Sequence, residues 1–309
     1  MTAQAGFDSV QAVTDALAEE RYISNTGLST SIFLALRMGK ALFLEGEPGV
    51  GKTEVAKALS RLLHTPLIRL QCYEGLDINQ AVYEWNYPRQ LLEIQARQRQ
   101  SNGAHGDQSD HDPVDDIFTD KFLMKRPLLQ AIDQANEQAP VLLIDEIDRA
   151  DEEFESFLLE VLAEFQITVP ELGTLKAKHI PIAIITSNRT REIHDALKRR
   201  CVYYWIDYPS REQEIEIVRL KVPGISERLT QQVVDFIHAA RQQELYKLPG
   251  VAETLDWAEA LGHLHQTTLD PDVVDATLGM ILKYQDDVNK MRGDRVRDLV
   301  AQAQAVGSE

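Results

Sequence analysis

Two hydrophobic patterns alternate over the first 208 residues of this 309-residue chain. Short continuous apolar runs are typical of strands buried on both faces of a sheet, and apolar residues at helical spacing are typical of amphipathic helices. The predicted strands cover residues 41–44, 67–72, 141–144, 180–186 and 202–206. Because helical segments separate them, the pattern predicts an α/β domain with a doubly wound, largely parallel sheet of five strands.

Helical spacing in the same part of the chain predicts several helices, over residues 1–21, 29–38, 54–59, 91–100, 132–138, 153–164 and 192–199. A turn signal at 170–173 lies between two short segments, 166–169 and 175–178, and predicts a hairpin. Residues 101–116 nearly lack apolar side chains, which predicts a mobile loop.

Strand signals stop after Pro209. Ser210 to Gln213 resembles a capping box, and helices are predicted over 210–222, 229–240, 254–263 and 270–291, with a final polar helix after Gly293. Asp270 is expected to cap the fourth of these helices, with Pro271 at its first position. A boundary near residue 208 therefore separates an α/β domain, 1–208, from an all-α domain, 209–309.

The composition is that of a soluble globular protein, with 44% hydrophobic and 26% charged residues. A net charge of −17 disfavours nonspecific attraction to nucleic acid or to an anionic membrane. Cys72 and Cys201 are far apart, so neither a disulfide framework nor a cysteine metal site is predicted. The sequence shows no signal segment and no long apolar run, so we expect a cytoplasmic protein.

The loop at 101–116 contains side chains that could be interpreted as metal ligands, namely His105, Asp107, Asp110, His111 and Asp112. A solvated acidic loop is the better interpretation, because nothing in the segment would fix the geometry of the ligands.

The strongest motif lies between the first predicted strand and the helix that follows it. Residues 46–53 match G-x-x-x-x-G-K-[ST] without a mismatch, in the strand–loop–helix context of a phosphate loop. The predicted nucleotide-binding residues are Gly46, Glu47, Pro48, Gly49, Val50, Gly51, Lys52, Thr53 and Glu54. Glycines let main-chain amides approach phosphate oxygens, Lys52 adds a charge for the β- and γ-phosphates, and Thr53 offers a hydroxyl to Mg²⁺.

Two carboxylates, Asp145 and Glu146, follow the predicted strand 141–144. Asp145 can hold Mg²⁺ through water, and Glu146 can orient and deprotonate the attacking water. A pair of solvated carboxylates at a strand end is the alternative, but the phosphate loop upstream makes the catalytic interpretation strong.

Further candidate residues lie at the ends of the predicted strand 180–186 and of the predicted helix 192–199. Asn188 ends the strand 180–186, beside Asp145 in a parallel sheet, where its amide could contact the γ-phosphate or the water. Asn is also a common strand-terminating residue, but the functional interpretation is favoured. Arg199 and Arg200 end a helix, where the dipole favours cations, but either could act as an arginine finger on a neighbouring subunit's nucleotide.

These motifs, in this order, resemble a MoxR-family AAA+ ATPase over nearly the whole chain. The resemblance implies a P-loop NTPase fold with a helical lid at 209–309, Asn188 as sensor 1, a pre-sensor hairpin at about 166–178 and a helix-2 insert at about 83–125. It also implies a ring hexamer that binds ATP and Mg²⁺ between subunits. The runs 83–89 and 187–192 resemble the subgroup encoded beside carbon monoxide dehydrogenase and related molybdenum hydroxylases.

This resemblance implies a chaperone-like role in maturing a metalloenzyme, often with a von Willebrand A-domain partner. One feature departs from many AAA+ proteins: residues 250–255, at the predicted start of the third lid helix, contain no basic residue where a sensor 2 arginine would stand, and Lys247 belongs to the preceding segment. Two alternatives remain, a nucleic-acid motor or loader and a non-hydrolysing nucleotide-gated scaffold. No Asn-Lys-x-Asp signal supports a guanine-nucleotide switch.

Overall fold

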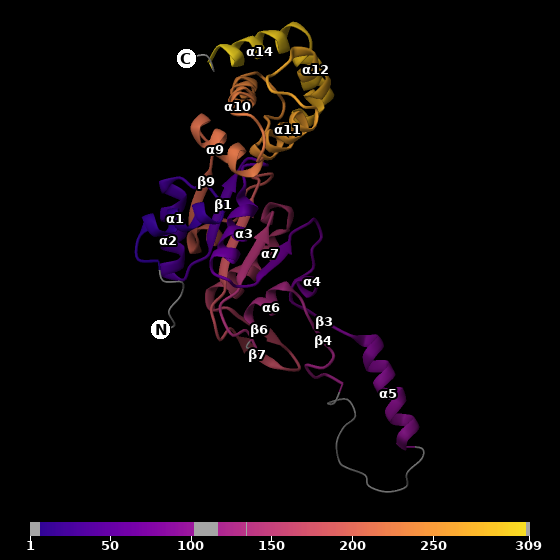
Figure 1. Ribbon diagram of the computed structural model, residues 1–309. Helices are drawn as coiled ribbons and strands as arrows, with labels where there is room; N and C mark the ends of the chain where they lie inside the picture. Colours follow the sequence, from indigo (N-terminus) through magenta and orange to yellow (C-terminus); the bar gives the residue numbers. More distant parts are fainter. Residues whose placement is uncertain (1–6, 102–116, 134, 307–309) are drawn as a thin grey trace. The chain divides into compact units, whose positions relative to one another are not determined.

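The computed structural model describes residues 7–101, 117–133 and 135–306 (Figure 1). The loop predicted over 101–116 lies outside the described residues apart from Ser101, and so do its histidine and aspartate side chains. The described chain divides into two compact units. The first contains residues 31–43 and 59–203, and the second contains residues 7–30, 44–58 and 204–306.

Five strands form the main sheet, as the apolar runs predicted. They are β1 (Leu42–Gly46), β2 (Leu67–Gln71), β5 (Val141–Asp145), β8 (Ile182–Ser187) and β9 (Val202–Ile206). Their order is β2-β5-β8-β1-β9, and β5 pairs in parallel with both β2 and β8. β1 and β5 are buried along their whole length, whereas the edge strands β2 and β9 are partly exposed.

Short helices and two antiparallel ribbons complete the first unit. Its helices are α4 (Ile78–Val82), α5 (Tyr87–Ser101), α6 (Pro127–Ile132), the 3-10 helix η1 (Ile147–Arg149), α7 (Glu152–Glu164) and α8 (Asp195–Arg200). One ribbon pairs β3 (Tyr83–Trp85) with β4 (Leu123–Lys125), and the other pairs β6 (Gln166–Val169) with β7 (Gly173–Lys176). Large apolar side chains, among them Trp85, Phe122 and Phe154, fill its core.

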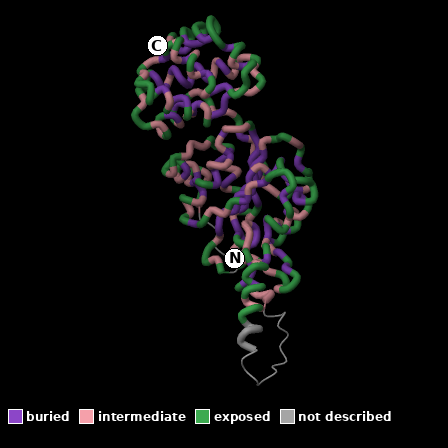
Figure 2. Tube along the Cα trace, turned by 90° about the vertical axis from the view of Figure 1, so that its right-hand side faces the viewer, coloured by how far each residue is buried: buried purple, intermediate pink, exposed green. Residues whose placement is uncertain are grey.

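The second unit is mainly helical. It contains α1 (Val10–Glu19), the first part of α2 (Thr26–Met38) and, after β1, the first part of α3 (Lys52–Leu62); the second parts of α2 and α3 belong to the first unit. After β9 come α9 (Arg211–Lys221), α10 (Glu227–Arg241), α11 (Val251–His263), α12 (Pro271–Ile281), α13 (Gln285–Met291) and α14 (Asp294–Val306). Phe236 and Trp257 are fully buried at the centre of the core of this C-terminal part, with ring centroids 5.2 Å apart. Figure 2 shows the buried positions on the inner faces of these helices.

Several predicted helix ends are confirmed. Ser210 caps α9 in a capping box with Gln213, and Asp270 accepts the amides that open α12, with Pro271 at the first helical position. Each cap satisfies amides that have no partner inside the helix.

The helix predicted over 132–138 is wrong, because α6 ends at Ile132. The carboxylate of Asp133 accepts the amide of Ala135, and the side chain of Asn136 donates to carbonyls in the last turn of the helix. Asp and Asn side chains that bond nearby main chain compete with helix formation, which explains the early end.

The single helix predicted over 270–291 is two helices, α12 and α13. The chain is extended at Leu282, whose side chain is buried in the core. Lys283 donates to two carbonyls of the last turn of α12, and Asp287, buried in α13, accepts two main-chain amides of residues 246 and 247. These tertiary contacts outweigh an uninterrupted helical spacing.

Two smaller differences concern strands. The second strand of the predicted hairpin, 175–178, is shifted, because β7 begins at Gly173, directly opposite Val169. The strand β3 was not predicted, and the helix α5 begins four residues before the predicted range 91–100. In the part of the chain that the structure describes, no helix is long and apolar enough to cross a bilayer.

Candidate active site

The phosphate-binding motif forms a turn between β1 and α3, and its glycines have the conformations that the motif requires. Gly49 and Gly51 have φ of 82° and 93°, a region that costs other residues free energy. Gly46 lies so close to the main-chain oxygen of Ile206 that a Cβ would collide with it. The loop therefore has the shape of a phosphate cradle.

Lys52 is buried and its ammonium group folds back over the loop. Its Nζ donates to Gly46 O at 2.8 Å and to Glu47 O at 2.7 Å. Burying a cation is costly, and an anion bound at the loop would offset that cost. Glu54, by contrast, lies within 4 Å of two ammonium groups, 3.5 Å from Lys57 and 3.7 Å from Lys221.

A small cavity of mixed polar and apolar lining adjoins the phosphate loop through Val50. It measures about 90 Å³, and Tyr22, Leu28, Tyr208 and Val251 are among the residues that line it. Burial raises the pKa of Tyr22 and also that of Tyr208, so both phenols stay neutral. Such a lining, in which aromatic and aliphatic side chains alternate with polar groups, suits a flat heteroaromatic ring.

Asp145 ends β5 and is buried, yet both its carboxylate oxygens accept hydrogen bonds. Thr186, in β8, donates its hydroxyl to Oδ1 at 2.5 Å. Arg69, in β2, donates from Nε and Nη2 to Oδ2 at 3.0 and 2.6 Å. Because a buried carboxylate is stable only when its oxygens have hydrogen-bond partners, these two neighbours satisfy Asp145 and fix its orientation.

Glu146 follows in the left-handed region, with φ 56°, which costs a non-glycine residue about 1–2 kcal/mol. Its amide donates to the Thr186 hydroxyl at 2.9 Å. Its carboxylate accepts from Asn188 Nδ2 at 3.3 Å and from Gln71 Nε2 at 3.1 Å. Gln71 also accepts from Arg69, so one chain of hydrogen bonds joins both carboxylates.

Asp148, two residues after Glu146, fixes the segment that carries Asn188. Its carboxylate accepts the amides of Asn188 and Thr190 at 3.1 and 2.9 Å, and the Thr190 hydroxyl at 2.6 Å. Burial by itself would raise the pKa of Asp148, but these hydrogen bonds lower it overall. The predicted neighbours Asp145, Glu146 and Asn188 are thus brought together by the first unit.

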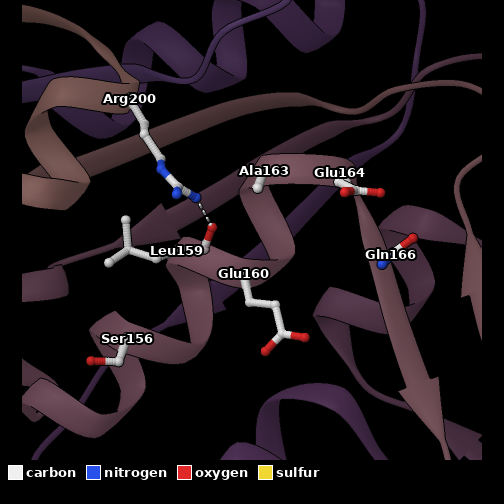
Figure 3. Close-up of a pocket in the computed structure, with 7 residues that line it drawn as sticks. All are labelled: Ser156, Leu159, Glu160, Ala163, Glu164, Gln166 and Arg200. Atoms are coloured by element: carbon white, nitrogen blue, oxygen red, sulfur yellow. Dashed lines mark hydrogen bonds between the residues drawn. The ribbon is translucent and has the colours of Figure 1, made fainter.

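The two arginines at the end of α8 differ in their surroundings. The Arg199 side chain is 82% exposed and forms a long ion pair, 3.7 Å, with Asp195 on its own helix. Arg200 donates to the carbonyl of Leu159 in α7. Figure 3 shows that side chain reaching across a hollow of about 470 Å³ beside α7.

The start of α8 is anchored by a buried carboxylate. Glu155, in α7, pairs with Arg191 and accepts the amide of His194. Arg191 also donates to the carbonyl of Ala150. These contacts fix the helix that presents both arginines.

The residues present fit ATP with Mg²⁺. The loop supplies two left-handed glycines and a buried ammonium group, which suit phosphate. Thr53, in the second unit, and Asp145, in the first, each carry a hard oxygen donor of the kind that Mg²⁺ prefers. Among the described residues, no cluster of His, Cys, Asp and Glu suggests a further metal.

Several residues of the site were not predicted from the sequence, namely Arg69, Gln71, Asp148, Thr186 and Thr190. Arg69 carried a signal, since it is a charged residue inside the otherwise apolar run 67–70. The others act through contacts between segments far apart in the sequence, which spacing along one segment does not reveal.

A five-stranded sheet with a phosphate loop after one strand and an acidic pair after another defines a P-loop ATPase. The model of the AAA domain, dynein-related subfamily, matches residues 41–201, and the chain belongs to this family. It is therefore an AAA+ ATPase that uses ATP with Mg²⁺.

The chain is also similar to several individual proteins. The gas vesicle ATPase GvpN of Haloferax mediterranei is 25% identical over 283 residues, which cover 87% of this chain and 76% of that protein. Solved structures of Thermotoga maritima RuvB are similar at lower sequence identity. The Holliday junction branch migration motor is 14% identical with a TM-score of 0.45, covering 88% of this chain and 72% of that one. A RuvB variant is 15% identical with a TM-score of 0.47, covering 91% and 73%.

Proposed function

We propose that this chain is a MoxR-type AAA+ ATPase that hydrolyses ATP to remodel or activate a client metalloenzyme. The observation that carries hydrolysis, rather than binding alone, is the position of Glu146. Its carboxylate lies next to Asp145 and is held between Gln71 and Asn188. A scaffold that only binds nucleotide has no need of a carboxylate held at two oxygens.

In the proposed reaction Lys52 and the loop amides bind the β- and γ-phosphates, and Thr53 and Asp145 would hold Mg²⁺. A bound Mg²⁺ would neutralise part of the phosphate charge. Glu146 accepts a proton from the attacking water, and Asn188 orients that carboxylate. The cavity lined by Tyr22 and Tyr208 would take the adenine ring.

We further propose a ring, the hexamer that the MoxR resemblance implies, in which Arg199 acts on the neighbouring subunit's ATP. Arg199 fits this role because it is exposed and only weakly paired, whereas Arg200 bonds to α7 and anchors its helix. An arginine finger must be able to reach a phosphate on another chain.

A mixing experiment tests action in trans. Arg199→Ala lacks the finger and Lys52→Ala lacks nucleotide binding, so each alone should be nearly inactive. A mixture contains interfaces with an intact ATP site and an intact finger, and we expect it to regain turnover. An inactive mixture of ring-forming variants would refute the assignment of Arg199.

The proposed client is a metalloenzyme such as a molybdenum hydroxylase of the carbon monoxide dehydrogenase type, with a von Willebrand A-domain protein as partner. The runs 83–89 and 187–192 support this choice. The test is to activate the purified, immature hydroxylase with this protein, the partner and ATP. We expect activation by the natural sequence and none by Glu146→Gln; equal activation by both would refute an ATP-driven role.

A nucleic-acid motor is the other function considered. The net charge of −17 weighs against it, because phosphate-backbone binding depends on basic side chains. Salt-dependent stimulation of ATP turnover by DNA would support the motor and contradict the maturation role.

A further inference from the structure

The first turn of α11 lies directly against the phosphate loop, in the place where the sequence offers no basic side chain. The amide of Ala252 donates to the carbonyl of Gly49 at 3.2 Å. The contact joins main-chain atoms of α11 to main-chain atoms of the phosphate loop, so it requires small residues in both segments.

Gly250 is required here by space rather than by conformation. Its φ of −83° and ψ of −179° are extended and open to any residue. A Cβ at Gly250, however, would lie 2.8 Å from Pro48 O and 3.0 Å from the Cα of Gly49. A side chain there would push the lid and the phosphate loop apart.

A buried ion pair holds this turn in place. Glu214, fully buried in α9, accepts from both terminal nitrogens of Arg241 at 2.6 and 2.8 Å and from the Thr254 hydroxyl at 2.7 Å. Arg241 also donates from Nε to Pro249 O at 2.8 Å. Three lid helices, α9, α10 and α11, therefore converge on the residue before Gly250.

The covalent geometry of the loop turns this contact into an effect on the nucleotide. In a trans peptide the carbonyl and the following N–H point in opposite directions. Because Ala252 fixes the Gly49 carbonyl towards α11, the N–H of Val50 must point away from α11. That N–H belongs to the loop whose amides would bind phosphate.

We propose that the start of α11 positions the phosphate loop through this main-chain hydrogen bond, and that Gly250 permits the contact. The lid then responds to nucleotide through its backbone, without a basic side chain at residues 250–255. Ala252 is a positioning residue in this scheme, since it acts through the Gly49–Val50 peptide. The proposal rests on the ATP site described above.

Coupling of this kind is reciprocal. If the α11 contact strengthens nucleotide binding, bound nucleotide must strengthen the α11 contact by the same factor. The Ala252 amide should therefore exchange with deuterium more slowly when nucleotide is bound.

The test compares two glycine-to-alanine variants of the full chain. Gly250→Ala introduces the collision, whereas Gly262→Ala lies in the same helix with nothing within 4 Å of the new methyl group. With fluorescent mant-ATP and magnesium as the probe, we expect the Kd of Gly250→Ala to rise about tenfold, within the usual range of such couplings. Gly262→Ala should stay within about twofold of the natural sequence, since an isolated surface change there touches nothing.

Hydrogen–deuterium exchange on the natural sequence gives a second measurement that does not depend on the folding of a variant. We expect ATP to slow exchange of the amides at 250–254 by a factor matching the change in Kd. A folded Gly250→Ala protein with unchanged Kd, or exchange at 250–254 that ATP does not slow, would overturn the proposal. Failure of the natural sequence to bind mant-ATP would instead contradict the ATP site itself.

Discussion

Thr186 offers the most direct test of how the buried carboxylate is held. Its hydroxyl donates to Asp145 Oδ1 at 2.5 Å and accepts the Glu146 amide at 2.9 Å. Thr186→Val keeps the shape of the side chain and removes both bonds. A hydrogen bond to a charged group contributes about 1.5–3 kcal/mol, and an amide left without a partner costs about 1–3 kcal/mol. We expect a loss of about 3–4 kcal/mol in the free energy of unfolding of the unit that contains Thr186.

Thr186→Ser is the matched control, because it keeps the hydroxyl and removes one methyl group, at a cost of about 1 kcal/mol. The magnesium requirement of nucleotide binding should also distinguish Thr186→Val from Thr186→Ser. Removing a group that orients a metal ligand typically weakens metal affinity about 10–100-fold. Thr186→Val should therefore need about tenfold more Mg²⁺ for half-saturated mant-ATP binding.

The assays are urea unfolding and magnesium titration of mant-ATP fluorescence, run on both variants. The expected order of stability is the natural sequence, then Thr186→Ser, then Thr186→Val. If Thr186→Val matched Thr186→Ser in both unfolding midpoint and magnesium requirement, the bridging role of the hydroxyl would be refuted.

Three further outcomes follow from the site and its surroundings. Arg199→Ala should lower kcat about a thousandfold in assembled rings, and Arg200→Ala far less; equal losses in steady-state phosphate release would contradict the distinction between them. Burial by itself would raise the pKa of Glu214, but hydrogen bonds from His238 and Arg241 and the charge of Arg241 lower it below 4.5. The ionised carboxylate of Glu214 therefore stabilises the fold at pH values above 4.5, and this stabilisation is lost as the pH falls through the lowered pKa. Glu214→Gln should reduce the fall in the free energy of unfolding on the acid side of a stability–pH profile. An unchanged slope would count against the pairing of Glu214 with Arg241. Asp148→Asn should lower kcat with little change in nucleotide Kd, because Asp148 fixes the amide of Asn188 rather than contacting nucleotide; a change in Kd alone would be the contrary result.

The sequence predicted the parts of the site that lie within one segment. The phosphate loop is contiguous, so its glycines and Lys52 were identified from spacing alone. Asp145, Glu146 and Asn188 were placed together because parallel strands bring their ends to one edge, and the Asn188 contact with Glu146 confirms that placement. Their catalytic roles remain predictions.

What spacing could not reveal are the contacts that cross between strands or helices. Arg69 and Gln71 reach the carboxylates from β2 only because β2 pairs with β5. The end of α6 at Ile132 depends on the side chain of Asn136, and the break before α13 on contacts with residues 246 and 247. At these two helix ends, side-chain hydrogen bonds outweigh a helical preference of about a few tenths of a kcal/mol per residue.

The central claim is that Glu146 activates water at an otherwise intact ATP site. The most direct measurement compares Glu146→Gln with the natural sequence in two assays, mant-ATP binding with magnesium and steady-state phosphate release. We expect an unchanged Kd together with a loss of turnover of about 10²–10⁴-fold, the usual contribution of a general base. Turnover by Glu146→Gln at the rate of the natural sequence would contradict the role of Glu146 as the general base.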